Sequence, residues 1–184
     1  GVGTSFEQYR NIYLSPSISY SYDDLTVEST ASQSLQKQKG TFSDLSFSYG
    51  ISADYRDRAY APTDGYISSF NQQIPIYADS PYIRNTYSLS KYLTLSPDAI
   101  GSFKFYASAI NGLDDKDVRI SKRVMLSNNK LRGFKSGKIG PKDGEDYVGG
   151  NYASSTNFGL ALPNLLPETT KTDVGLFLDI GNLW

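Results

Sequence analysis

Strict alternation of apolar and polar residues is the feature that most constrains the fold of this chain. Between residues 12 and 22 the even positions are mainly aliphatic or aromatic, and four of the odd positions are serine. Between residues 44 and 56 the odd positions carry the apolar side chains instead. A period of two puts one kind of side chain on each face of a β-strand, whereas a helix needs a period near 3.6. The pattern therefore predicts long strands with one apolar and one polar face.

Five more segments follow this alternation less strictly, namely residues 66–76, 87–95, 103–109, 152–162 and 174–184. Residues 2–6 fit the tail of an eighth strand, and no segment predicts a helix. Successive antiparallel strands alternate direction, so their connections alternate between the two ends of the sheet. The long connections, 28–43 and 114–147, then share one end with a middle-sized link around Asp79-Ser80-Pro81. The short turns at 62–65, 96–98 and 164–172 lie at the other end.

Two architectures accommodate seven or more such strands. In a soluble sandwich the apolar faces form a core, and typical strands have about five or six residues. In a transmembrane barrel the apolar face meets lipid, and about 9–11 residues cross the bilayer. The expected strands are of the longer kind, and long loops at one end with short turns at the other match outer-membrane barrels. The barrel is therefore favoured, with interfacial aromatics near the strand ends at Tyr20, Tyr22, Tyr55, Tyr60, Tyr66, Tyr77 and Trp184.

The composition narrows the function. Eighteen basic and 19 acidic side chains give a net charge of −1, which argues against a nucleic-acid surface. The absence of cysteine removes disulfides and thiolate metal sites, and the absence of histidine removes the commonest general base and zinc ligand. The negative mean hydropathy suggests a soluble protein. A barrel strand needs only every second residue to be apolar, however, so the average hides a membrane face.

Four local motifs stand at defined places on this strand pattern. Leu131-Arg132-Gly133-Phe134 lies in the long 114–147 loop and is followed by Ile139-Gly140-Pro141. Gly150-Asn151 then opens the next strand, and the last strand contains Phe177-Leu178-Asp179-Ile180-Gly181-Asn182-Leu183-Trp184. Upstream, Asp57-Arg58-Ala59-Tyr60-Ala61-Pro62-Thr63-Asp64-Gly65 lies between two strands. In order and spacing these motifs resemble the BamA-type outer-membrane assembly proteins of the bacterial surface antigen family, over essentially the whole chain.

The resemblance implies that residues 1–184 are part of an antiparallel barrel of sixteen strands, from the end of strand six to strand thirteen. The 114–147 loop would be the sixth extracellular loop, and residues 57–65 a periplasmic turn. The periplasmic POTRA domains, the early strands and the last three strands would lie outside the chain. Seven strands also fit a partial barrel, because bacterial single-chain barrels have even numbers.

The function implied by the resemblance is the folding and insertion of β-barrel proteins into the outer membrane of Gram-negative bacteria, within the BAM complex. This segment would supply a stable wall and a bracing loop, without catalysis, metal or cofactor. The implied partners are outer-membrane lipids and lipopolysaccharide, nascent outer-membrane proteins, and accessory lipoproteins bound through the missing periplasmic domains. No nucleic-acid partner is expected.

The family also implies how the loop is held. Its motif arginine, here Arg132, docks on acidic residues of the lumen wall, and a guanidinium–carboxylate pair is strengthened in a shielded lumen. The alternation points Asp179 into the lumen, which makes it the expected partner. Gly133 is expected to allow a tight turn and Phe134 to pack against the wall. The family's second acidic position falls at Gly159, which has no side chain.

Alternative functions remain at this stage. A TamA-like or two-partner-secretion transporter shares the fold and an RGF-type loop. A passive porin would have a water-filled lumen and no need for these motifs. An enzyme barrel would be expected to use a histidine, and a soluble carbohydrate-binding sandwich would use exposed tyrosines.

Overall fold

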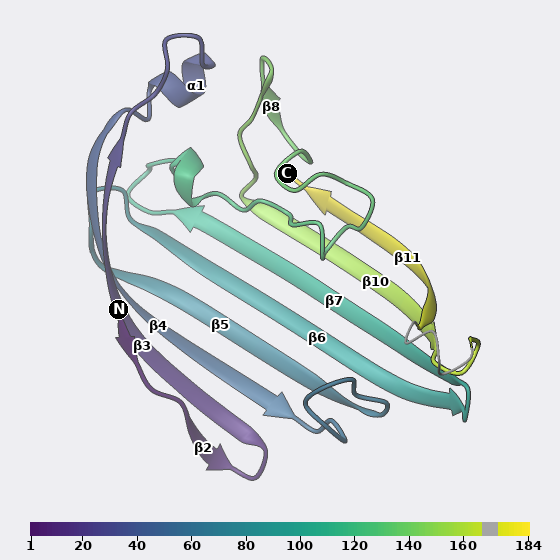
Figure 1. Cartoon of the computed structure of the whole chain (residues 1–184). Coiled ribbons are helices and arrows are strands. Elements are labelled where there is room, and N and C mark those ends of the chain that lie inside the picture. The colour runs from purple at the N-terminus through teal and green to yellow at the C-terminus, as the bar shows by residue number, and fades with distance from the viewer. Residues whose placement is uncertain (167–172) are drawn as a thin grey trace.

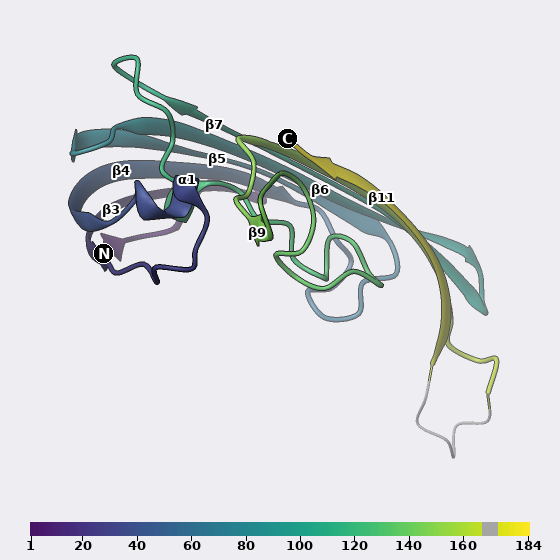
Figure 2. The same ribbon diagram turned by 90° about the horizontal axis from the view of Figure 1, so that it is seen from above.

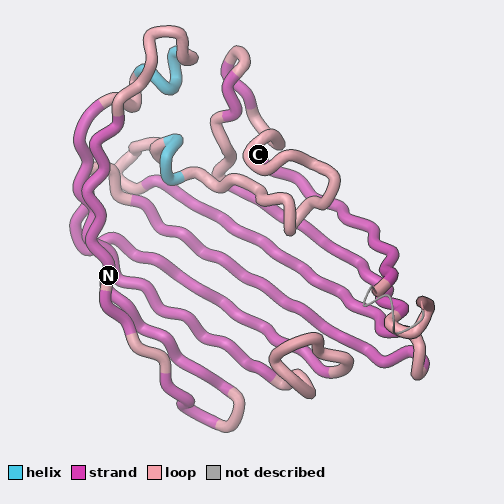
Figure 3. The backbone as a smooth tube through the Cα atoms, in the orientation of Figure 1, coloured by secondary structure: helices cyan, strands magenta, loops and turns pink. Residues whose placement is uncertain are grey.

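The computed structural model, which describes residues 1–166 and 173–184, is built on one curved antiparallel sheet (Figures 1 and 3). Its long strands are β3 (Ile12–Leu25), β4 (Gly40–Asp54), β5 (Gly65–Ala78), β6 (Tyr82–Ser96), β7 (Ala99–Gly112), β10 (Tyr152–Leu162) and β11 (Val174–Leu183). Each pairs with the next one along the chain, so β3 and β11 lie toward opposite edges. The seven strands expected from the alternation are confirmed, and the sheet is not closed.

The first edge is formed by a strand in two pieces. β1 (Val2–Gly3) and β2 (Phe6–Tyr9) both pair antiparallel with β3, Val2 opposite Ile18 and Phe6 opposite Leu14. The tail of an eighth strand expected at residues 2–6 is therefore real and extends to Tyr9. It joins β3 through a tight turn in which Asn11 has a positive φ of 62°, a conformation that asparagine tolerates better than most residues.

The connections separate by size as the alternation of ends requires. The links 26–39 and 113–151 share one end with the short link 79–81, which is therefore not the middle-sized link that was expected. The other end has the links 10–11, 55–64, 97–98 and 163–173, and residues 167–172 of the turn expected at 164–172 lie outside the described residues.

The long connections also contain short elements that the alternation did not predict. These are the single-turn helix α1 (Gln33–Gln36), the 3₁₀ turn η1 (Ile120–Lys122), and a small hairpin of β8 (Lys142–Asp143) and β9 (Asp146–Tyr147). The expectation of no helix was wrong in this detail, because one turn is too short to show a 3.6-residue period. Within the described ranges, no helix has the length and apolar character needed to cross a membrane.

The two faces of the sheet differ in what covers them. The convex face exposes large apolar side chains, including Ile18, Tyr20, Ile51, Leu93, Phe158, Leu176, Leu178 and Ile180. The concave face buries polar residues, including Asp44, Ser46, Ser108, Ser155 and Asn157. Figure 2 shows the 113–151 loop lying against this concave side. A sandwich would bury the apolar face, so the exposed convex face identifies a barrel wall.

The hydrophobic core lies between the loop and the concave face. The loop contributes Val118, Val124, Leu126 and Leu131, and the sheet contributes Tyr82, Ile110, Ala153 and Leu183. These sheet residues come from β6, β7, β10 and β11, so the loop is packed across four neighbouring strands. Burial of this apolar surface holds the loop against the concave face of the sheet, so that charged residues of the loop lie close to charged residues of the strands.

Candidate loop-docking site

Arg132 is attached to Asp179 by three hydrogen bonds. Its Nε donates to Asp179 Oδ2 at 2.8 Å, and its Nη2 donates to Oδ1 at 2.6 Å. Its backbone N–H donates to the same Oδ2 at 2.9 Å. Both carboxylate oxygens are used by the guanidinium fork, the geometry that makes arginine–carboxylate pairs strong and directional. The structure thus brings together the two residues that the motif and the alternation had paired.

The guanidinium also stacks on an aromatic ring. The Arg132 Cζ atom lies 3.9 Å from the centroid of the Phe177 ring, within cation–π range. Phe177 and Asp179 are two residues apart on β11 and therefore share its concave face. The Asp179 side chain is only 4% exposed, and Arg132 is 41% exposed. The hydrogen bonds to Asp179 raise the pKa of Arg132 above its ordinary value, so the cation is fixed at any physiological pH.

The residues beside Arg132 fix its place on the wall. Leu131 is buried, and a Cβ atom at Gly181 would lie 3.0 Å from its Cδ1 atom. Asn157 on β10 donates from Nδ2 to the carbonyl of Lys130 at 2.8 Å. The loop backbone is therefore tied to β10 while its side chains contact β11.

The rest of the first motif turns away from the wall. Gly133 has a φ of 85°, the left-handed conformation that glycine adopts without strain. Phe134 is 57% exposed, so the strands described here do not bury it and the expected packing against the wall is not seen. The turn at Gly133 directs the chain away from the sheet immediately after Arg132.

The Ile139-Gly140-Pro141 segment brings the loop back to β11. Gly140 has a φ of 95°, and a Cβ there would lie 2.6 Å from Leu183 Cδ2, so only glycine fits without displacing the leucine. Ile139 packs against the hydrophobic core, and the Pro141 carbonyl accepts a hydrogen bond from Val148 N at 3.1 Å. The backbone of this segment lies directly against β11, so position 140 has no room for a side chain and is glycine.

The loop ends where β10 begins. Gly150 exchanges two backbone hydrogen bonds with Val124, at 2.8 and 3.1 Å. The Asn151 carbonyl accepts from Ile110 N at 2.8 Å. Trp184 exchanges backbone hydrogen bonds with Tyr152 and stacks its ring on that tyrosine at a centroid distance of 6.1 Å. The strand-opening motif and the final tryptophan therefore close the base of the loop.

Gly159 supplies no second carboxylate. It lies on the concave face of β10 opposite Ser102 of β7, as the sequence pattern indicates. Among the described residues, Asp179 is the one acidic side chain in an ion pair with Arg132. The docking therefore uses one carboxylate and one aromatic ring, and the ring was not expected from the sequence.

The turn at residues 57–65 is built around Asp57. Its carboxylate accepts from Thr63 N at 3.0 Å, from Thr63 Oγ1 at 2.8 Å and from Asp64 N at 3.1 Å. Desolvation acts to raise the pKa of Asp57, but these hydrogen bonds outweigh it and lower the pKa to about 2. The motif at this position is thus a self-contained turn at the end of the sheet opposite the long loops.

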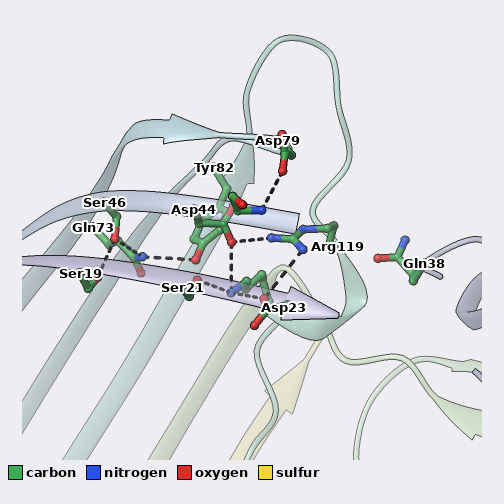
Figure 4. A network of polar contacts seen from close by, with 12 residues as sticks. Ser19, Ser21, Asp23, Gln38, Asp44, Ser46, Gln73, Asp79, Tyr82 and Arg119 are labelled. Carbon is green, nitrogen blue, oxygen red and sulfur yellow. Dashed lines mark hydrogen bonds and ion pairs between the residues drawn. The ribbon is translucent and has the colours of Figure 1, made fainter. Parts of the chain in front are cut away.

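The structure adds a second charged cluster that sequence reasoning missed. Arg119 Nη2 donates to Asp44 Oδ2 at 2.5 Å (Figure 4). Lys122 Nζ lies 2.8 Å from Asp23 Oδ2 and 3.2 Å from Asp44 Oδ2. The cations come from the loop, and the carboxylates from β3 and β4. The sequence features that could have indicated this cluster are an aspartate on each of the serine-rich faces of β3 and β4 and a loop rich in basic residues.

Comparison with known proteins identifies the family. The Omp85 superfamily domain model matches residues 1–184. The chain belongs to the Omp85 superfamily. A SAM50-like protein of Schizosaccharomyces pombe is 28% identical over 163 residues, covering 83% of this chain and 34% of that protein. The outer membrane protein assembly factor BamA of Neorickettsia risticii is 28% identical over 170 residues, covering 90% of this chain and 23% of that protein.

A solved structure supports the same Omp85 fold. The crystal structure of BamA from Haemophilus ducreyi lacking POTRA domains 1–3 aligns with a TM-score of 0.84 and 19% identity, covering 98% of this chain and 40% of that one. The chain therefore spans about a quarter to two fifths of the length of these Omp85 relatives. Its curved sheet is a piece of a multi-pass outer-membrane β-barrel.

Proposed function

We propose that the protein carrying this chain folds and inserts β-barrel proteins into the bacterial outer membrane. The membership of the Omp85 superfamily and the similarity to a protein named as a BamA assembly factor support this function. The observation that carries the proposal is the attachment of Arg132 to Asp179, which holds a long loop inside the wall. The chain's own part in the function is mechanical, and no catalytic residue or cofactor is assigned to it.

The loop would keep this part of the barrel rigid while the barrel acts on its substrates elsewhere. It contacts β6, β7, β10 and β11 through the apolar core, and Arg132 adds a directional lock on β11. Packed interiors resist deformation, so a wall filled in this way retains its curvature under load. The seam of the barrel, formed by strands outside this chain, could then open without collapse of the opposite side.

The finer assignments are part of the same proposal. The chain would run from the end of strand six to strand thirteen of a sixteen-stranded barrel, with 114–147 as the sixth extracellular loop. Nascent outer-membrane proteins would be its substrates, and the convex face would contact outer-membrane lipids and lipopolysaccharide. Accessory lipoproteins of the BAM complex would bind through periplasmic domains.

Related functions fit the observations less well. A passive porin needs an open lumen, whereas here the loop lies against part of the concave face (Figure 2), on which polar wall residues such as Asp44 and Asn157 are buried. A TamA-like or two-partner-secretion transporter would share the docked loop. The assembly function is preferred over it because the matched bacterial relative carries the assembly name.

Growth of a depletion strain tests this function. The protein carrying this chain is expressed as the wild type, as Arg132→Ala, as Asp179→Asn and as the double variant, with Lys135→Ala as the control. Lys135 is an exposed cation of the same loop. We expect both single variants to lower the amount of folded outer-membrane proteins. The double variant should be no worse than either, because the two side chains act as one unit. Normal assembly by both single variants would contradict the bracing role.

A further inference from the structure

We propose that the loop has a second, separate anchor, in which Arg119 and Lys122 neutralise a pair of wall carboxylates, Asp23 and Asp44. This inference builds on the proposed bracing role, because it adds the residues that position the first half of the loop. It assigns a role to four charged residues that none of the sequence motifs contains.

The wall presents two like charges side by side. Ser21 of β3 is paired with Asp44 of β4, and Asp23 follows two residues later on the same face. Asp23 and Asp44 are therefore diagonal neighbours on adjacent strands, a spacing of about 7–8 Å at which like charges repel. Asp44 is also buried on the concave face. A carboxylate pair in this position needs cations nearby, and the wall strands β3 and β4 supply none to it.

The loop supplies both cations. Lys122 Nζ bridges the two carboxylates, at 2.8 Å from Asp23 Oδ2 and 3.2 Å from Asp44 Oδ2. Arg119 hydrogen-bonds Asp44, and its Nη1 lies 3.9 Å from Asp23 Oδ2. Two cations thus face two carboxylates, and the formal charges cancel. Burial acts to lower the pKa of Lys122, but its hydrogen bonds to the two carboxylates outweigh burial and raise it.

Neighbouring groups hold the cations in place. The Arg119 guanidinium lies 4.1 Å from the centroid of the Phe42 ring. Gln38 of the other long loop accepts a hydrogen bond from Ile120 N at 3.1 Å, and Arg84 of β6 donates to the Lys122 carbonyl. Contacts from β4, β6 and a second loop therefore converge on residues 119–122, as expected of a built site rather than of a chance surface contact.

The position of the cluster gives it a distinct task. It attaches the loop to β3 and β4, near one edge of the sheet, while Arg132 attaches it to β11 at the other edge. With both anchors in place the loop spans the sheet and fixes the distance between its sides. Arg132 alone would hold only one side, so residues 119–122 determine where the first half of the loop lies.

Hydrogen exchange on the purified protein carrying this chain, in lipid vesicles, tests the second anchor. In Arg119→Ala/Lys122→Ala, exchange at residues 117–124 should become about 100-fold faster, because a broken buried ion pair costs about that factor or more. Leu131 and Arg132, whose amides are hydrogen-bonded to Ser127 and Asp179, should keep their protection. Arg132→Ala should give the reverse pattern, and Lys135→Ala should change neither segment. If the double variant does not fold, the single variant Arg119→Lys takes its place. It retains the charge, so residues 117–124 should keep part of their protection from exchange.

The wall side provides a rescue. Adding Asp23→Asn/Asp44→Asn to the double alanine variant removes the repelling carboxylates, so the thermal stability of the barrel should recover while the first half of the loop remains exchangeable. Unchanged exchange at residues 117–124 in Arg119→Ala/Lys122→Ala, or no recovery in the quadruple variant, would overturn the proposal. Hydrogen exchange tests the second anchor, whereas the assembly assay in the depletion strain tests the bracing role. Failure of one proposal can therefore be distinguished from failure of the other.

Discussion

The two attachments of the loop differ in how completely they are made. At Arg132, two hydrogen bonds and an aromatic face engage a guanidinium that remains partly exposed, and the backbone N–H adds a third hydrogen bond to Asp179. At Arg119 the side chain is only 4% exposed, yet neither its Nε nor Asp44 Oδ1 has a hydrogen-bond partner among the residues that the structure describes. The first attachment depends on geometry and the second on the balance of buried charges. The second should therefore tolerate the loss of one partner less well.

The largest effect is expected from Asp44→Ala. Among the described residues, this change leaves the buried Arg119 with the more distant Asp23 as its ion-pair partner. Breaking a buried ion pair costs about 3–5 kcal/mol. Ser48→Ala, on the same face of β4, is the matched control and should cost far less. Thermal unfolding of the protein carrying this chain, followed by its heat-dependent mobility on gels, gives the measurement. A cost for Asp44→Ala no larger than that for Ser48→Ala would remove the distinction between the two anchors.

A smaller loss is expected from Asp179→Asn. The amide retains the shape of the carboxylate but loses the charge that receives the guanidinium fork. Hydrogen bonds to charged groups contribute about 1.5–3 kcal/mol, and the partial exposure of Arg132 places the loss near 2 kcal/mol. Arg132→Lys should cost a similar amount, because a lysine cannot reproduce the bidentate pair. The same unfolding measurement compares both with Asp44→Ala, and an equal or larger loss at Asp179 would reverse the predicted order.

Phe177→Leu separates the aromatic contribution of the first anchor from its charge. Leucine retains an apolar side chain beneath Arg132 but has no ring to stack against the guanidinium, so the loss should be about 0.5–1 kcal/mol. In Asp179→Asn, where the fork is already weakened, the additional effect of Phe177→Leu should differ from its effect in the wild type. A double-mutant cycle on unfolding free energies measures this coupling, and strict additivity would show that ring and carboxylate act independently.

The same contrast explains what the sequence could predict. The period-two pattern placed all seven long strands and pointed Asp179 into the lumen, because strand faces follow from local alternation alone. The Arg132 motif is contiguous, so its resemblance to a known family was readable. Its stacking partner Phe177 lies on the predicted face, but a stacking distance depends on how deeply the loop enters, which no local pattern records.

The second cluster combines residues from three distant segments. Asp23, Asp44 and Arg119 are each an ordinary charged residue in the sequence, and they meet only after β3 and β4 pair and the loop folds back over them. The cluster therefore follows from tertiary structure, and it could not be predicted before the register of β3 with β4 and the path of the loop were known. The one-turn helix α1 was missed for a related reason, since tertiary contacts hold it rather than helical periodicity.

One of those contacts is also titratable and gives the smallest predicted effect. Asp143 of the β8–β9 hairpin accepts a hydrogen bond from Ser34 N at 2.9 Å, and the hydrogen bonds from Ser34 lower the pKa of this carboxyl below its ordinary value. A lowered pKa in the folded state means that the contact stabilises fully above about pH 5, where the carboxyl is almost completely ionised even when free, and that it weakens as the pH falls through the free and then the lowered value.

Hydrogen exchange at residues 32–36, corrected for intrinsic rates, should therefore speed up between about pH 4.5 and pH 2.5. Asp143→Asn has no charge to lose at this position, so Ser34, whose N–H donates to Asp143, should show the same exchange at both pH values. The amides at the Arg132 anchor should stay protected from exchange over the same pH range if this anchor is independent of the contact between Asp143 and Ser34. Loss of protection at Leu131 and Arg132 together with residues 32–36 would show instead that the β8–β9 hairpin and the Arg132 anchor form one cooperative unit.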